Sequence, residues 1–244
     1  MSTPLKVSIE ILADPDALAH RVAEWLLDLA RSSDGAFAIA LSGGSTPKRL
    51  YQLLAQSPYR ETFPWERTHL FWGDERYVPH DDPLSNYRMV NEALLSHVPI
   101  PRNNIHPVPV AVRSPDKAAS AYQRDLESFF GAMDFDPSRP LFNVVLLGLG
   151  EDGHTASLFP GTAVLQERKK WVAAVVGAKS EPRITLTYPA LESSGHAAFL
   201  LEGSGKTAIF QRIRGGDDSL PAARLHPRGD LRWFLDRAAA GAAS

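Results

Sequence analysis

The sequence contains no cysteine. This absence excludes disulfides, thiolate nucleophiles, iron–sulfur clusters and cysteine-ligated zinc together. No apolar run approaches the 18 residues that a membrane span needs, and residues 1–16 lack the basic and apolar segments of a signal peptide. We therefore expect no membrane partner and a cytoplasmic address.

The sequence also has little net charge, because 26 Lys and Arg residues against 28 Asp and Glu residues leave −2. A near-neutral chain has no electrostatic footprint for nucleic acid, so no nucleic-acid partner is expected and an anionic ligand must be held by local groups. Its 44% hydrophobic and 22% charged residues are typical of a globular protein. Since no repeat or low-complexity linker interrupts residues 1–244, we interpret them as one domain.

Short apolar runs alternate with helical patterns along the chain. Strands are expected at 5–12, 36–41, 68–72, 142–147, 171–176, 184–187, 197–201 and 231–235. Helices are expected from 15 and from 45 onward, and at 87–97, 115–130 and 206–214. Strands that alternate with helices predict an α/β fold with a mostly parallel, doubly wound sheet. Ligands bind such a sheet beyond the carboxyl ends of its strands, so motifs at those ends are candidates for a site.

The first such motif follows a buried strand and consists of Ser42, Gly43, Gly44, Ser45, Thr46 and Pro47. Two glycines let the backbone turn sharply and approach a ligand closely. Ser45 or Thr46 can cap the helix that begins there, and the N–H groups of its first turn attract an anion. The motif predicts a phosphate cradle, and a plain strand–turn–helix connection is the alternative.

Two further motifs place basic side chains at strand ends. Asp74 and Arg76 directly follow the strand at 68–72, and Arg76 can contact a phosphate bidentately. A solvated rim of charges would look the same, so both interpretations stay open. Lys206 follows a Gly-Ser-Gly stretch that resembles the end of a P-loop, but the full pattern requires a glycine where Leu200 stands. Lys206 can still reach a phosphate from the start of its helix.

The segment 148–157 contains Gly-x-Gly-x-x-Gly after an apolar strand, which is the dinucleotide-binding pattern. That interpretation needs an acidic residue at the end of the next strand, where Gly177 stands instead, so we reject it. What remains is Asp152-Gly153-His154 at the carboxyl end of a strand of the sheet. A histidine near a helix N-terminus favours the neutral form that a general base needs. A histidine that only bonds backbone is the alternative, and no pattern indicates a metal site.

Five segments, taken in order, resemble the 6-phosphogluconolactonase family. They are SGGSTP, FWGDERYVP with SNYRMV, NVVLLGLGEDGHTASLFPG, PRITLTYPAL and LPAARLHP, which lie within residues 36–235. The resemblance implies a Rossmann-like fold with helices on both faces of the sheet, and no cofactor. It also implies hydrolysis of 6-phospho-D-glucono-1,5-lactone to 6-phospho-D-gluconate, the second step of the oxidative pentose phosphate pathway.

The resemblance further implies that His154 is the general base that activates the attacking water. Asp152 is then expected to orient the imidazole of His154 or to shape the loop. The expected phosphate ligands are the glycine loop, Arg76, Lys206 and Arg183. Asp74 is expected to contact the sugar or Arg76.

Two other functions remain open from the sequence. The related glucosamine-6-phosphate deaminases carry a Glu five residues after the corresponding His, and in this chain that position is Phe159. A non-catalytic sugar-phosphate sensor is the other alternative, although no basic helix-turn-helix segment precedes residue 36. The expected assembly is a monomer or a weak homodimer.

Overall fold

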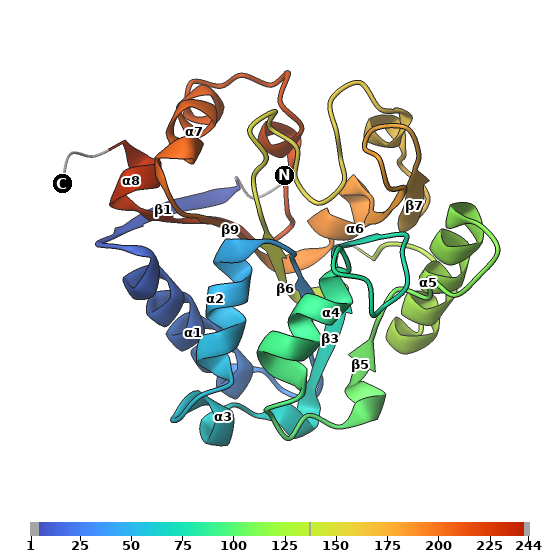
Figure 1. Cartoon of the computed structure of the whole chain (residues 1–244), viewed down its shortest axis with the longest axis horizontal. Coiled ribbons are helices and arrows are strands. Elements are labelled where there is room, and N and C mark those ends of the chain that lie inside the picture. The colour runs from blue at the N-terminus through green and yellow to red at the C-terminus, as the bar shows by residue number, and fades with distance from the viewer. Residues whose placement is uncertain (1–4, 137, 242–244) are drawn as a thin grey trace.

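The computed structural model describes residues 5–136 and 138–241. Its main element is a sheet of seven strands in the order β1-β10-β9-β6-β2-β3-β5 (Figure 1). All neighbouring pairs in this sheet are parallel, which confirms the predicted fold class. The strands are β1 (Lys6–Leu12), β2 (Phe37–Leu41), β3 (Thr68–Trp72), β5 (Ile105–His106), β6 (Phe142–Leu147), β9 (Ser194–Leu201) and β10 (Asp230–Asp236).

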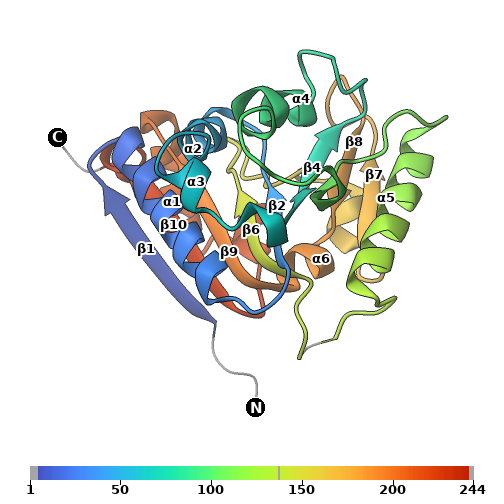
Figure 2. The ribbon, with the colours of Figure 1, turned by 90° about the horizontal axis from the view of Figure 1, so that it is seen from below.

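A second, smaller sheet differs from the prediction. In it β4 (Asp74–Arg76), β8 (Arg183–Leu186) and β7 (Val172–Val175) pair antiparallel in the order β4-β8-β7 (Figure 2). We expected the strands at 171–176 and 184–187 to belong to the parallel sheet, and this is wrong. Only a short loop joins β7 to β8, whereas parallel neighbours need a crossover of about a dozen residues or more. Because β4 follows β3 after one residue, the small sheet stands at the carboxyl end of the parallel one.

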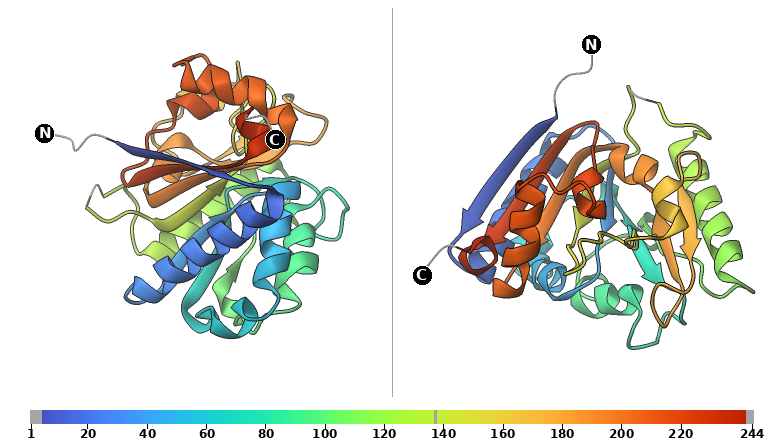
Figure 3. Two further views of the ribbon diagram at one scale, coloured as in Figure 1. Left: turned by 90° about the vertical axis from the view of Figure 1, so that its left-hand side faces the viewer. Right: turned by 90° about the horizontal axis from the view of Figure 1, so that it is seen from above.

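Helices cover both faces of the parallel sheet. α1 (Pro15–Ser32) and α2 (Ser45–Leu54) lie on one face, and α7 (Thr207–Arg214) and α8 (Arg237–Ala240) lie on the other (Figure 3). The other helices are α3 (Tyr59–Thr62), α4 (Asn86–Val90) with a π-helical turn after it (Asn91–Leu95), α5 (Pro115–Phe130) and α6 (Tyr188–Glu192). No helix in the described part of the chain is long and apolar enough to cross a membrane.

The two longest helices begin at the residues that the sequence predicts. Asp14 caps α1 by accepting a hydrogen bond from Ala17 N at 2.8 Å, with Pro15 as the first helical residue. Ser114 caps α5 in the same way, with Lys117 N donating at 3.3 Å. Each cap satisfies a backbone N–H group that the first helical turn leaves without a partner.

The candidate site lies where the strand order reverses. β2 and β6 pair in the middle of the parallel sheet, and the chain continues to β3 on one side and returns as β9 on the other. Such a switch point leaves a crevice beyond the carboxyl ends of the two strands. Ser42 and Gly148 are the first residues beyond those ends. The topology therefore brings together two motifs that lie about a hundred residues apart in the sequence.

Candidate active site

A cavity of about 370 Å³ opens at this switch point. The expected site residues that line it are Ser42, Gly43, Gly44, Ser45, Thr46, Asp74, Arg76, His154, Arg183 and Lys206. Asp152 is the expected residue outside the lining, and it is hydrogen-bonded to His154. One cavity thus gathers side chains from five separate segments of the sequence.

The glycine loop presents the N-terminus of α2 to this cavity. α2 begins at Ser45 and its N-cap is Gly44, at φ 107°, a left-handed conformation that suits glycine. We expected Ser45 or Thr46 to cap the helix, and this is wrong because both residues already lie within it. No side chain caps the first turn, so its N–H groups are available to an anion. Gly43 is equally constrained, since a Cβ there would lie 2.1 Å from Asn86 Oδ1.

Two arginines lie opposite each other on neighbouring strands of the small sheet. Arg76 of β4 and Arg183 of β8 are register partners. Burial lowers the pKa of Arg183, and the charge of Arg76 adds to this effect. Arg183 Nη1 is buried without a hydrogen-bond partner among the described residues. An anion in contact with both guanidinium groups would supply that partner and offset their repulsion. Beside them, the Asp74 carboxylate accepts a hydrogen bond from Ser157 Oγ at 2.6 Å.

Glu75 fixes the backbone around these side chains, and its role is not predicted from the sequence. It is 1% exposed, and its carboxylate accepts hydrogen bonds from the backbone N–H groups of Arg76, Asn86 and Tyr87, each at 2.7 Å. Burial raises the pKa of Glu75, and these three bonds oppose the rise. The side chain therefore joins β4 to the start of α4, which fixes Asn86 against the glycine loop. In the sequence, the run Asp-Glu-Arg looks equally like a solvated rim.

His154 is held by its own loop. Its backbone N–H donates to Asp152 Oδ1 at 3.1 Å, and its ring Nδ1 is hydrogen-bonded to the same carboxylate. Burial raises the pKa of Asp152, but the hydrogen bonds from His154 outweigh it and hold that pKa below its ordinary value. An ionised Asp152 accepts the proton on Nδ1, which leaves Nε2 as the free nitrogen of a ring that lines the cavity.

The backbone around His154 differs from the expectation of a helix N-terminus. Residues 151–162 form turns, and the next helical turn begins only at Ala163. Gly153 and Ala156 adopt positive φ values of 79° and 47°, which a helix does not allow. Gly153 O also accepts a hydrogen bond from Ala222 N at 2.9 Å, so a distant segment holds the loop in place. The expected helix dipole behind His154 is therefore wrong.

Phe159 and Lys179 complete the wall beside His154. The Phe159 ring lies 4.5 Å from the imidazole, centroid to centroid. Lys179 Nζ lies 5.1 Å from the centroid of that ring and 4.0 Å from Asp152 Oδ2. Both side chains line the cavity. In the sequence, Phe159 is informative only because it stands where the deaminases have a Glu. Lys179 is not predicted from the sequence, because the loop that carries it has no recognisable spacing from the histidine.

Lys206 reaches the cavity from the segment between β9 and α7. It precedes α7, and its Nζ donates to Leu149 O at 2.8 Å, next to the carboxyl end of β6. The prediction that Lys206 stands at the start of a helix after a strand is confirmed, since it is the N-cap of α7. Its ammonium keeps two further protons for a ligand.

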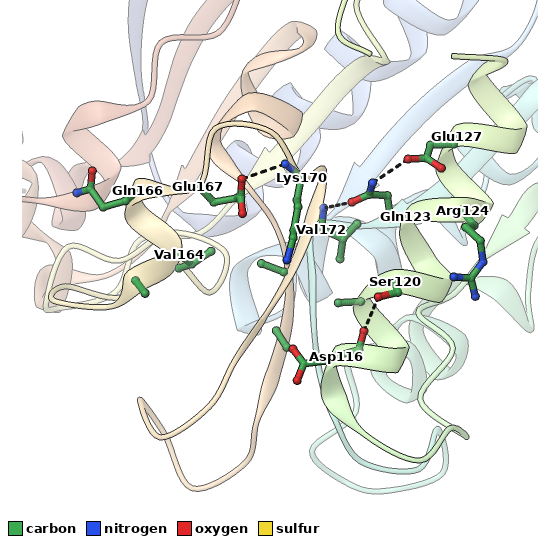
Figure 4. Close-up of a pocket in the computed structure, with 14 residues that line it drawn as sticks. Asp116, Ser120, Gln123, Arg124, Glu127, Val164, Gln166, Glu167, Lys170 and Val172 are labelled. Carbon is green, nitrogen blue, oxygen red and sulfur yellow. Dashed lines mark hydrogen bonds between the residues drawn. The ribbon is translucent and has the colours of Figure 1, made fainter. Parts of the chain in front are cut away.

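A larger cavity, of about 740 Å³, lies between α5 and β7, away from these residues (Figure 4). Some of its polar groups bond one another or the nearby backbone. Gln123 donates to Glu127 at 2.7 Å and accepts from Trp171 N at 3.1 Å, while Glu167 accepts from Lys170 N at 3.0 Å. None of the motif residues lines it.

Comparison with known proteins identifies the family of this chain. The family model described as glucosamine-6-phosphate isomerases/6-phosphogluconolactonase matches residues 13–233. The chain belongs to this family. The 6-phosphogluconolactonase of Nostoc sp. is 42% identical over 98% of both chains. The crystal structure of 6-phosphogluconolactonase from Thermotoga maritima matches with a TM-score of 0.80 and 32% identity, over 95% of this chain and 100% of that one.

The other branch of the family shares the fold. The structure of a monomeric glucosamine-6-phosphate deaminase matches with a TM-score of 0.80 over 97% of this chain and 99% of that one, at 20% identity. At that identity the likeness shows the fold alone. The distinction between the two branches therefore depends on the side chains in the cavity.

Proposed function

We propose that this protein hydrolyses 6-phospho-D-glucono-1,5-lactone to 6-phospho-D-gluconate. The observation that carries the proposal is that His154, bonded to Asp152, lines the same cavity as an uncapped helix N-terminus and three basic side chains. A base and an anion site in one crevice suit a substrate with a phosphate at one end and a reactive carbonyl at the other. The 42% identity to a 6-phosphogluconolactonase over nearly the whole chain supports the same substrate.

The phosphate would bind the first-turn N–H groups of α2 together with Arg76, Arg183 and Lys206. The surroundings of Arg183 support phosphate binding most strongly. Its buried Nη1 has no partner among the described residues, and its charge is repelled by that of Arg76. Binding at this end holds the sugar in one orientation, which places the lactone carbonyl against the water beside His154. In this arrangement Asp74, fixed by Ser157, faces the sugar ring.

His154 would take a proton from water through Nε2 as the water oxygen attacks C1. The carbonyl carbon becomes tetrahedral, the bond from C1 to the ring oxygen then breaks, and the proton passes from the imidazole to that oxygen. Asp152 keeps the Nδ1 proton in place and stabilises the imidazolium that forms between the two transfers. The charge of Lys179, 4.0 Å from Asp152, adds a smaller contribution to the hydrogen bonds from His154 that lower the pKa of Asp152.

Phe159 argues against deamination. A second carboxylate at this position would accept a hydrogen bond from the imidazole or carry a proton, and an aromatic ring 4.5 Å from the imidazole does neither. The sensor alternative does not explain why an ordered Asp152–His154 pair faces the cavity. We also propose, as the sequence analysis expects, that residues 1–244 form one cytoplasmic domain.

The decisive experiment supplies freshly prepared lactone to the purified protein and follows acid release against the spontaneous rate. We expect a large acceleration that inorganic phosphate and 6-phosphogluconate inhibit competitively. The same preparation is offered glucosamine 6-phosphate. Ammonia release from that amine, with no acceleration of lactone hydrolysis, would reverse the assignment.

A further inference from the structure

The strand β1 forms an open edge of the parallel sheet. It pairs with β10 along one side, and no strand in the described residues pairs with its other side (Figure 2). The register with β10 runs unbroken over all seven residues, and β1 contains no proline. Natural proteins usually protect such an edge with proline, a bulge, a very short strand or several charges. β1 has none of the first three, so its outer N–H and C=O groups are available to another strand.

One face of β1 is apolar and uncovered. Val7, Ile9 and Ile11 alternate along the strand and are 51%, 42% and 52% exposed, and we call them the β1 strip. Their register partners on β10 are Leu231, Trp233 and Leu235, and Trp233 packs on Phe210 of α7 at 5.5 Å. All three partners are buried, so this face is covered at β10 and about half exposed at β1.

The other face of β1 carries one charge of each sign. Glu10 accepts hydrogen bonds from Arg21 of α1, at 2.7 Å from Nε, and lies 3.6 Å from Arg232. Lys6 is exposed and has no ion pair within the described residues. The two charges stand four residues apart, with Ser8 midway between them.

We propose that β1 pairs antiparallel with β1 of a second copy of this chain, about a twofold axis at Ser8. In that register Ser8 faces Ser8 of the second copy, Val7 faces Ile9, and Lys6 faces Glu10. Each charge then meets its opposite, twice by symmetry, and directly opposed residues lie about 4.5–5.5 Å apart. The two β1 strips join into one apolar band, and the two parallel sheets become one continuous sheet.

A second copy fits this edge because the edge is complementary to itself. A twofold interface requires residue i to contact j while j contacts i, and the pairs of Lys6 with Glu10 and of Val7 with Ile9 meet that condition. β10 and β9 separate β1 from β6, so the dimer leaves the cavity at the switch point open. The inference therefore does not depend on the proposed function.

Sedimentation equilibrium of the full chain tests the proposal. We expect a dimer, and we expect Ile9→Lys to give a folded monomer with an unchanged circular dichroism spectrum and unchanged lactone hydrolysis. Met133→Lys is the matched control, because Met133 is 79% exposed and lies outside β1. The wild-type chain remaining a monomer over the whole concentration range would overturn the proposal, as would a dimer that survives Ile9→Lys.

Cysteine substitution tests the register, because the chain has no cysteine of its own. Ser8→Cys should cross-link nearly completely on mild oxidation, since the two Ser8 positions face each other within the reach of a disulfide. Lys6→Cys is the control, because four residues of strand, about 13 Å, separate the two copies of that position in the proposed register. Equal cross-linking of both variants, or cross-linking of Lys6→Cys alone, would overturn the antiparallel pairing at Ser8.

Discussion

The two cavities of this protein differ in how their polar groups are used. In the larger one, between α5 and β7, each of Gln123, Glu127 and Glu167 bonds a neighbour in the same wall. In the smaller one, at the switch point, Arg183 Nη1 lacks a partner among the described residues and the helix N-terminus of α2 has no side-chain cap. The smaller cavity therefore has a buried guanidinium nitrogen without a partner among the described residues, whereas Gln123, Glu127 and Glu167 of the larger one are already bonded.

This difference indicates that volume is a poor guide to function here. The larger cavity has about twice the volume of the smaller one, yet its charges are of both signs and do not gather around one base. The smaller cavity gathers Arg76, Arg183 and Lys206 near one base, an arrangement that packing alone does not require. The first two predictions compare variants in one cavity with controls in the other.

The largest effect is expected for His154→Asn. Removing a general base lowers the chemical step and leaves substrate binding nearly unchanged, so kcat should fall by about 100-fold or more. Binding of 6-phosphogluconate, measured by calorimetry, should persist. Lys170→Met in the larger cavity is the matched control and should leave kcat unchanged. Near-wild-type kcat in His154→Asn would place the base elsewhere.

The next effect concerns the phosphate. Arg76→Met, Arg183→Met and Lys206→Met should each weaken binding of 6-phosphogluconate by about 10- to 150-fold, which corresponds to the loss of about 1.5–3 kcal/mol from one charge-assisted contact. Hydrolysis of unphosphorylated gluconolactone should change little, and Arg124→Met in the larger cavity should affect neither substrate. Equal losses on both lactones would mean that these side chains act on the fold.

A smaller effect is expected for Lys179→Met. Lys179 lies near Asp152 without a close hydrogen bond, and exposed pairs of this kind contribute about 0.2–1 kcal/mol. We expect kcat to fall about two- to fivefold with KM unchanged, and Lys179→Arg to restore most of it because the charge and the contact with Phe159 are kept. A change in KM alone would mean that Lys179 binds substrate instead of positioning Asp152.

The sequence predicts the parallel sheet well because most of its strands contain short apolar runs, while β1 alternates apolar and polar residues. Two features escape it. β5 has only two residues, too few for a periodic pattern. β7 and β8 look like their parallel neighbours in composition, and what distinguishes them is the short loop between them. The pairing of β8 with β4 is a contact between segments about a hundred residues apart, which no local pattern encodes.

In the candidate site, too, the residues within local motifs are predictable and those that depend on distant contacts are not. His154 and the glycine loop stand at strand ends within strong motifs, so their convergence on one cavity is predictable from the topology. Glu75 and Lys179 are not, because their importance comes from partners that the folded chain supplies, namely the backbone N–H groups of Asn86 and Tyr87 and the carboxylate of Asp152. The N-cap of α2 was misassigned by one or two residues because Gly44, Ser45 and Thr46 are all acceptable caps in sequence.

The smallest effect is expected far from the site, where α5 packs on a histidine pair. Phe129 of α5 contacts His69 and His106, with ring centroids 4.6 Å and 5.1 Å away. His69 Nδ1 and His106 Nε2 are hydrogen-bonded at 3.1 Å, and His106 also stacks on Phe71. Burial, aided by His69, lowers the pKa of His106 to about 4, and burial lowers that of His69.

This pair should make the fold sensitive to acid without affecting the cavity at the switch point. Below pH ~6.5 the unfolded chain binds a proton at His106, while the folded chain does not until about pH 4, so stability is full above pH ~6.5 and falls as the pH drops toward 4. Solvent screens the half-exposed pair, so we expect only about 1 kcal/mol, a loss of about 2–4 °C in Tm. His106→Phe keeps the stack on Phe71 and should show a smaller fall in Tm between pH 7.5 and pH 5. An identical fall in wild type and variant would mean that acid acts on other groups, and a changed kcat in the variant would mean that the two regions are coupled.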